Sequence, residues 1–340
     1  MANTQSIAAL RAKVWYKELF ADVPTMLFMN RFLGESANSP IQVCRDLSKG
    51  AGEYVEFGLS SKLSGDGVTG DDELEGNEEE ILTYQTELHI DQLRHAVRLK
   101  GNMDEKKVAY NMRKDAKEKL KTWWAERIDR EILWKLSGVT AKTFANTPTA
   151  PSANRAIWAG NAGADNSLTA TMVMDTKVLD AAKELALTST PKVRPIKNEN
   201  SQETGEAKYI VIMHPYQFSQ LRKDPVWNEM ARNAAERGGN NPLFTGALKE
   251  YNGLYIYQHE LAYYFTNTGQ VTCARAILMG QQAGIMGIGR DEKWVEQTKD
   301  FENKWGIAAG RIFGVIKPKF NSEDYGLITI ATAAAKATTA

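Results

Sequence analysis

The chain has 340 residues and carries 42 Lys and Arg against 42 Asp and Glu, so its formal net charge is zero. A composition of 43% hydrophobic and 25% charged residues is typical of a globular protein, and the length indicates about two domains. The neutral balance argues against a dedicated nucleic-acid-binding protein, whose affinity rests on excess Lys and Arg. The N-terminus lacks a signal-peptide pattern, and no apolar run approaches the ~20 residues that span a bilayer.

The first part of the chain predicts an arm followed by a strand pattern. Residues 5–20 place apolar side chains at spacings of three to five among basic ones, which indicates a short amphipathic helix. Pro24 and the segment 34–40 interrupt regular structure. Residues 41–45 and 53–57 then alternate between apolar and polar like strands, and they predict the start of a hairpin-like extension.

Residues 63–90 contain nine acidic side chains and no Lys or Arg. Four glycines between residues 65 and 76 oppose a stable helix at the tip. Residues 81–90 partly alternate and read as the returning strand. The sequence therefore predicts a long, acidic-tipped loop, and loops longer than ~15 residues in compact domains are usually functional.

No Gly or Pro interrupts residues 104–136, which predict one long helix with Asp104 as N-cap and Gly138 just past its end. At ~1.5 Å per residue this helix would be about 50 Å long. A repeat of four advances about 40° per step, so the apolar row winds around the helix and should meet several neighbours rather than one coiled-coil seam. The row consists of Val108, Met112, Ala116, Leu120, Trp124, Ile128, Ile132 and Leu136.

Basic side chains gather on and before this helix. Residues 91–137 carry thirteen basic and eight acidic side chains, directly after the acidic loop. The basic face of the helix is either a solvated surface or a docking strip for an acidic partner. Its members in the first half of the helix, opposite the apolar row, are Lys106, Lys107, Arg113, Lys114, Lys117 and Lys121.

The later chain predicts an α+β domain over residues 140–289, after a connecting segment at 140–166. Its expected elements are helices at 171–187 and from Pro215 towards Arg237, and strands at 209–213, 254–258 and 276–279. Residues 305–320 and 325–332 read as late strands that return to the first half of the chain.

No motif supports catalysis, a cofactor or a metal. Residues 65–70 match the letters of a dinucleotide loop, but no helix follows and the surrounding acids would repel phosphate. Residues 71–82 mimic the first half of a calcium loop, but the twelfth position is Leu82 rather than a bidentate carboxylate. The four histidines show no zinc-site spacing, and no base, nucleophile and oxyanion donor can be assembled. We therefore assign no catalytic, cofactor-binding or metal residue and predict that the protein is not an enzyme.

The order of several sequence segments resembles the major capsid proteins of tailed bacteriophages with the Hong Kong ninety-seven type fold. The resemblance covers most of residues 40–325. The segments are Leu59-Ser-Ser-Lys-Leu-Ser-Gly-Asp-Gly-Val-Thr-Gly through Leu74-Glu-Gly-Asn-Glu-Glu, Ile90-Asp-Gln-Leu-Arg-His-Ala-Val, His214-Pro-Tyr-Gln with Leu221-Arg-Lys-Asp-Pro-Val-Trp, Leu243-Phe-Thr-Gly-Ala with Tyr251-Asn-Gly-Leu, and Ala276-Ile-Leu-Met-Gly-Gln-Gln-Ala.

This resemblance implies an α+β capsid fold with four parts. They are an N-terminal arm (1–45), an extended β-hairpin loop (46–95), a peripheral domain (96–139 and 290–340) on a spine helix at 104–136, and an axial domain (140–289). It also implies self-assembly into hexamers and pentamers of an icosahedral shell that encloses phage DNA, in the virion, after assembly in the host cytoplasm. The implied partners are other copies, a separate scaffolding protein or none, portal and decoration proteins, and double-stranded DNA bound non-specifically.

In such a shell each loop reaches over the adjacent subunit, and complementary charge fixes register. We therefore hypothesise that Asp71, Asp72, Glu73 and Glu75 face basic residues of a neighbouring subunit, and the candidates are Lys114, Lys117 and Lys121. The competing interpretation is a nucleic-acid-associated binding protein that uses the basic face of the long helix. A shell protein forms very large closed assemblies, whereas a binding protein forms monomers or small symmetric oligomers.

Overall fold

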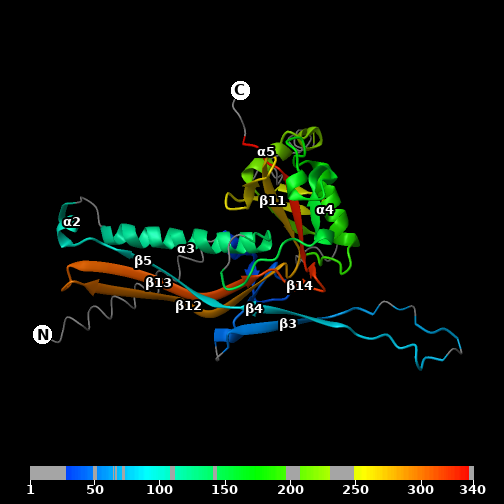
Figure 1. Cartoon of the computed structure of the whole chain (residues 1–340), viewed down its shortest axis with the longest axis horizontal. Coiled ribbons are helices and arrows are strands. Elements are labelled where there is room, and N and C mark those ends of the chain that lie inside the picture. The colour runs from blue at the N-terminus through cyan, green and yellow to red at the C-terminus, as the bar shows by residue number, and fades with distance from the viewer. Residues whose placement is uncertain are drawn as a thin grey trace, which may run out of the picture.

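The computed structural model describes residues 28–48, 52–63, 65, 67–70, 73–107, 112–140, 144–196, 207–229 and 249–336. The helix predicted at 5–20 lies outside these residues. The described residues form two sheets, one long helix and a projecting hairpin (Figure 1), which confirms the α+β prediction. No helix among them is both long and apolar enough to cross a membrane.

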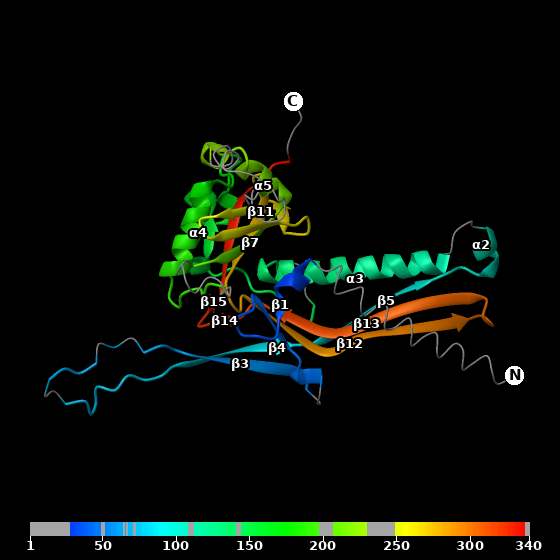
Figure 2. The ribbon, with the colours of Figure 1, turned by 180° about the vertical axis from the view of Figure 1, so that it is seen from behind.

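The first sheet has five strands in the order β1-β2-β12-β13-β5. Its longest members, β12 and β13, pair antiparallel along most of their length, and β13 pairs antiparallel with β5. These three strands form an elongated ribbon that runs beside helix α3 (Figures 1 and 2). The strand bounds are β1 Leu33–Gly34, β2 Ile41–Cys44, β5 Asp91–Arg98, β12 Gly284–Lys299 and β13 Lys304–Ile316.

The predicted helix at 104–136 is wrong at its start. Helix α2 spans Asn102–Lys107 and helix α3 spans Met112–Leu136, so Asp104 lies inside α2 and is not an N-cap. At ~1.5 Å per residue α3 is about 38 Å long rather than 50 Å.

The apolar row of α3 is confirmed as the core-facing row. Leu120, Trp124, Ile128, Ile132 and Leu136 are each at most 1% exposed, and they join one core cluster with residues of both large sheets. The helix ends as predicted. Gly138 has φ +68°, its N–H donates to the Lys135 carbonyl and the Val139 N–H donates to the Trp134 carbonyl. This pair of bonds is a Schellman motif, which needs a residue that tolerates positive φ.

The second sheet, in the order β6-β16-β11-β7-β9-β8 with β10 on β11, is covered by helices α4 and α5 (Figure 1). Strands β7 (Tyr209–Met213) and β9 (Leu254–Gln258) match their predicted positions. Helix α4 starts at Thr176 rather than 171, because the Asp175 side chain caps it by accepting from the Val178 N–H. The other bounds are β6 Ala156–Trp158, β8 Lys249–Tyr251, β10 Tyr264–Thr266, β11 Thr272–Met279, β16 Leu327–Ala333, α4 Thr176–Thr188 and α5 Pro215–Leu221.

Short elements connect these layers, and the late strands divide between the two sheets. Strands β12 and β13 belong to the five-stranded sheet, whereas β16 pairs with β11 in the seven-stranded sheet. Residues 290–340 therefore contribute to both sheets, and the domain boundaries stay a prediction. The short elements are η1 Met29–Phe32, η2 Asp46–Ser48, η3 Ala153–Arg155, η4 Ala159–Asn161, η5 Asp165–Ser167, β14 Lys319–Phe320 and β15 Glu323–Asp324.

Strand β12 was not predicted, and three glycines, a residue type that is depleted in strands, lie within its first six residues. A side chain at Gly287 would approach Leu88 within 2.6 Å, and one at Gly289 would approach Ile90 within 2.5 Å. These glycines therefore serve close packing against the end of the hairpin strand β4 rather than a turn.

Candidate assembly interface

A two-stranded hairpin projects from the body of the molecule. Strands β3 (Tyr54–Ser60) and β4 (Thr83–His89) pair antiparallel from Tyr54 opposite His89 to Ser60 opposite Thr83. Figures 1 and 2 show that the hairpin extends to one side while α3 and the free end of the β12–β13 ribbon extend to the other. The strands predicted at 53–57 and 81–90 are thus confirmed as one hairpin. An isolated hairpin is at best marginally stable in water, so a projecting one needs further contacts.

The loop beyond the strands is held by local hydrogen bonds. The Ser61 N–H donates to the Leu82 carbonyl at 2.7 Å, and the Leu82 N–H donates to the Ser61 hydroxyl at 2.9 Å. Farther out, the Gly65 N–H donates to the Glu79 carboxylate at 2.8 Å. These bonds tie the outgoing arm of the loop to the returning arm.

The loop exposes both charge and apolar surface. Glu73 and Glu75 are exposed, and Asp71 and Asp72 lie outside the described residues. Among its apolar side chains, Leu63 is 53% exposed, Leu74 61%, Ile81 58% and Leu82 48%. Apolar side chains seldom gather on a surface at such exposure unless a partner covers them.

The root of the hairpin is clamped to the body by one amide. The Asn146 side-chain oxygen accepts from the His89 N–H at 2.9 Å, and its nitrogen donates to the His89 carbonyl at 2.8 Å. Gly314 on β13 faces the same carbonyl, and a Cβ there would clash with it. Leu88, which is fully buried, packs with Ile285 and Ile316. The last residues of β4 are therefore fixed from both sides.

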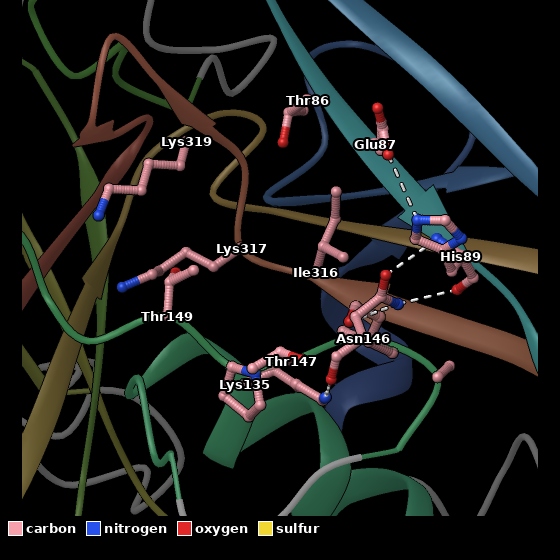
Figure 3. A pocket seen from close by; sticks show the side chains of 13 residues that line it. Thr86, Glu87, His89, Lys135, Asn146, Thr147, Thr149, Ile316, Lys317 and Lys319 are labelled. Atoms are coloured by element: carbon pink, nitrogen blue, oxygen red, sulfur yellow. Dashed lines mark hydrogen bonds and ion pairs between the residues drawn. The ribbon is translucent and has the colours of Figure 1, made fainter.

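Beside this clamp lies a pocket of about 300 Å³ between β4, the end of α3 and the start of β14 (Figure 3). Lys135 is buried, and its ammonium donates to the carbonyls of Phe144 and Asn146. Burial lowers the pKa of Lys135, and the carboxylate of Glu131 at 3.5 Å opposes that shift. Its position secures the segment that carries Asn146 to helix α3.

A second buried lysine secures the other side of the pocket. Lys317 forms an ion pair with Asp324 at 2.9 Å and donates to the Ala150 carbonyl at 3.4 Å. Burial lowers the pKa of Lys317, and Asp324 opposes that shift. Both buried ammonium groups already have carboxylate and carbonyl partners, so the pocket is a structural junction at the hairpin root.

The three lysines proposed as partners of the acidic loop are not equivalent. Lys114 is exposed, Lys121 is half-buried, and Lys117 is only 6% exposed. The interpretation of the helix face as uniformly solvated is therefore wrong at Lys117. Within one chain the structure does not bring the loop to this face, because the hairpin points away from α3 (Figure 1).

The histidines take four separate structural positions. His89 lies 3.4 Å from Glu87, His95 stacks on Trp123 at a ring distance of 4.1 Å, and His214 caps helix α5 through Nδ1. His259 lies 4.0 Å from the buried Asp129, whose carboxylate accepts from two N–H groups of the η1 segment. In the described part of the chain no three His, Cys, Asp or Glu side chains are placed to hold a metal.

Sequence reasoning missed the hairpin root and one surface. Asn146, Lys135 and Lys317 gave no signal, because their roles depend on contacts between distant segments. The missed surface lies on the ribbon of β5, β13 and β12, and the sequence did indicate it. Arg94, Ala96 and Arg98 are two residues apart along β5, and Lys293 and Lys299 share one parity of β12. Alternation of that kind places basic side chains on one face of a sheet.

Comparison with known proteins agrees with this architecture along nearly the whole chain. The sequence model of the family described as "Phage capsid protein" matches residues 3–336. The major capsid protein of Pseudomonas phage KPP25 is 31% identical, over 94% of this chain and 94% of that protein. The solved capsid of Ralstonia phage GP4 superposes with a TM-score of 0.77 at 31% identity, covering 91% of each chain. The capsid of cyanophage Pam1 agrees in fold, with a TM-score of 0.77 at 19% identity and coverage of 90% and 92%.

Proposed function

We propose that this chain, which belongs to the phage capsid protein family and is a major capsid protein, assembles into hexamers and pentamers of an icosahedral shell around phage DNA. The observation that supports this assembly mode is the projecting hairpin. Its loop carries exposed acids and exposed leucines but rests on no other described part of its own chain (Figure 1). Such a segment gains buried area only when another molecule covers it.

The root of the hairpin is fixed to the body of the molecule, whereas its tip is free to contact another molecule. The clamp from Asn146 to His89 and the packing of Leu88 fix the root, whereas the loop is tied only to itself. A fixed root limits the entropy lost when the loop docks, because fewer bonds must be ordered at that moment. We infer that the loop lies across an adjacent copy in the shell.

Charge would set the register of this contact. Residues 63–90 carry nine acids and no base, whereas the chain as a whole is neutral, so each copy brings both signs in separate regions. Complementary charges steer association and fix register more than they add affinity. We propose that Asp71, Asp72, Glu73 and Glu75 face basic residues of the neighbour. Lys114 and Lys121 are accessible candidates on α3, and Lys117 is not, because it is buried.

The remaining parts of the proposal follow from the family. The shell belongs to the virion, and we propose that it assembles in the host cytoplasm, with a separate scaffolding protein or with none, and with a portal, decoration proteins and non-specifically bound double-stranded DNA as partners. The role needs no catalytic step. It also needs no bound cofactor.

The experiment for this proposal reverses the loop acids. Changing Asp71, Asp72, Glu73 and Glu75 to Lys should abolish shells at physiological salt, as seen by velocity sedimentation and negative-stain microscopy. Changing Glu302, an exposed acid at the β12–β13 turn, to Lys is the matched control and should leave assembly intact. Unchanged assembly with unchanged salt dependence in the loop variant would show that these acids do not mediate the contact.

A further inference from the structure

Lys317 and Asp324 form the most deeply buried ion pair in the described part of the chain. Their side chains are 1% and 0% exposed, and Lys317 Nζ lies 2.9 Å from Asp324 Oδ2. Lys317 directly follows β13, and Asp324 is the last residue of β15, so the pair joins the two ends of the turn that contains β14. Removing two charges from water carries a cost that their attraction offsets only when further hydrogen bonds satisfy both groups. The hydrogen bonds around the pair therefore indicate whether it is stable as an ion pair.

The two oxygens of the Asp324 carboxyl group have unlike surroundings. Oδ2 accepts from the Lys317 ammonium and, at 3.1 Å, from the Ser152 N–H. Oδ1 is also buried, but it has no hydrogen-bond partner among the described residues. Most buried polar atoms are hydrogen-bonded, so a buried carboxylate oxygen without a donor needs an explanation.

The environment of Lys317 favours the neutral amine. Its Nζ has two acceptors, Asp324 Oδ2 and the Ala150 carbonyl at 3.4 Å, for the three N–H groups of an ammonium. Burial lowers the pKa of Lys317, the charge of Asp324 opposes this shift, and the charges of Lys319 and Arg275 add to it. Moving one proton from Nζ to the carboxyl group converts two buried charges into two neutral groups. The neutral amine is the nucleophilic form of lysine.

We infer that Lys317 and Asp324 of the same folded chain condense into an isopeptide bond without the help of another protein. The Nζ lone pair attacks Cγ of the neutral Asp324 carboxyl group, a bond between Nζ and Cγ forms, and the bond between Cγ and Oδ1 breaks. The carboxyl proton and one amine proton leave with Oδ1 as a molecule of water. The step is a condensation, so it requires no oxidant, reductant or other co-reactant.

The hydrogen bonds already present around the pair fit the product. Oδ2 becomes the oxygen of the new amide and keeps the Ser152 N–H as its donor. The single N–H that remains on Nζ can donate to the Ala150 carbonyl. The oxygen that leaves is Oδ1, the one without a partner. After condensation both polar atoms of the amide have partners and no charge of the pair stays buried.

Neighbouring groups assist the attack on Cγ. Negative charge collects on Oδ2 as Nζ adds, and the Ser152 N–H already donates to that atom, as an oxyanion donor does. The buried guanidinium of Arg155 interacts electrostatically with Asp324 and adds a positive charge nearby. Lys317 also lines the pocket of about 300 Å³ at the hairpin root (Figure 3), so the released water has space to leave the site.

The other buried lysine of this pocket lacks these features. Lys135 Nζ lies 3.5 Å from Glu131 Oε1 and donates to two backbone carbonyls, so three acceptors surround its ammonium. The other oxygen of Glu131 is held by Arg127 in a second ion pair at 2.5 Å. We therefore expect Lys135 and Glu131 to stay an ion pair, which makes them an internal control in the same molecule.

The isopeptide bond joins the end of β13 to β15 beside the root of the hairpin. It closes a loop of eight residues, 317–324, and so restricts the turn that contains β14. This modification goes beyond the proposed function, because it lies within one chain and needs no assembly. Its failure would therefore leave the proposed function untouched.

Mass spectrometry of the full chain after denaturation tests the inference. The intact mass should lie one water below the mass of the sequence. A tryptic digest should contain a branched peptide that joins residues 312–319 to residues 320–336 through Lys317 and Asp324. Lys317→Arg keeps the positive charge but removes the amine, so this variant should show the full mass of its sequence. Lys319→Arg is the matched control and should still lose one water.

The parent chain decides the question by itself, even if a variant fails to fold. A parent chain with the full mass of its sequence and no branched peptide would overturn the inference and leave Lys317 and Asp324 as an ordinary ion pair. A loss of water that persists in Lys317→Arg would place the dehydration at other residues and would overturn it as well. A branched peptide that joins Lys135 to Glu131 instead would contradict the role assigned to the oxygen without a partner.

Discussion

The side-chain amide of Asn146 bonds both the N–H and the carbonyl of His89, at 2.9 and 2.8 Å, and so fixes the backbone at the root of the hairpin. The two residues are 57 positions apart. The buried Lys135 fixes the segment that carries Asn146, and the buried Leu88 fixes the end of the strand that carries His89. The direction of the hairpin is thereby set by the body of the molecule rather than by the hairpin strands.

Replacing Asn146 with Ala should lower the free energy of unfolding by about 2 kcal/mol, because its two hydrogen bonds to His89, worth about 1 kcal/mol each, are lost together with a longer one to the Val315 carbonyl. Urea denaturation of the unassembled chain measures this change. Thr147→Ala, at the exposed next position, is the control and should shift stability by less than about 0.5 kcal/mol. Equal stability of the two variants would show that the clamp contributes nothing.

Gly314→Ala should weaken the hairpin root more than Gly58→Ala. At Gly314 a Cβ would collide with the His89 carbonyl, which is backbone and cannot rotate away, whereas at Gly58 the nearest atom is 4.0 Å distant. We expect the Gly314 variant to expose the amides of β4 to solvent. Hydrogen exchange of residues 83–89 in the two variants measures the difference. Matching protection would contradict the close approach.

Trp124→Ala should destabilise the chain by about 3–5 kcal/mol, because it empties a large site in a packed core. Trp124 is fully buried, and its Nε1 has no hydrogen-bond partner among the described residues. Trp124→Phe should therefore cost much less than Trp124→Ala, since no hydrogen bond is lost. Thermal unfolding of both variants distinguishes the two costs, and similar losses would indicate that the indole nitrogen is bonded.

The Asp224 carboxylate should contribute stability that disappears in acid. Burial opposes its ionisation, but bonds from the hydroxyl and N–H of Thr176, at 2.6 and 2.7 Å, lower the pKa of Asp224 below its usual value of 3.8. A carboxyl whose pKa is lower in the folded state stabilises the fold above the unfolded pKa and loses that effect as pH falls. Asp224→Asn should therefore be less stable than the parent at pH 6, and the gap should shrink below pH ~3.8. Urea denaturation at pH 6 and pH 3 measures both gaps, and a constant gap would contradict the assignment.

Sequence reasoning succeeded where one local rule dominates. The run Tyr209–Met213 is apolar at every position and folds as a strand buried on both faces. The four-residue row of α3 predicted its buried face, and Gly138 predicted its end. Alternation from residue 53 and again from 81 predicted the two hairpin strands.

It failed where distant contacts override local signals. Helix α2 begins at Asn102, so Asp104 lies inside it and is not an N-cap, and Lys117 is buried although its position in the helical pattern suggested a solvated face. Strand β12 was missed because its glycines are explained only by close packing against Leu88 and Ile90, which are about 200 residues earlier in the chain. The hairpin root depends on Asn146, and the sequence around Asn146 does not differ from that of an ordinary polar loop.

Velocity sedimentation with negative-stain microscopy on the full chain expressed alone tests the central claim most directly. The account predicts closed shells or ring-shaped hexamers and pentamers at physiological salt. A stable monomer that binds double-stranded DNA tightly at the same salt concentration would contradict it, because assembly would then not be the property that the projecting hairpin supplies.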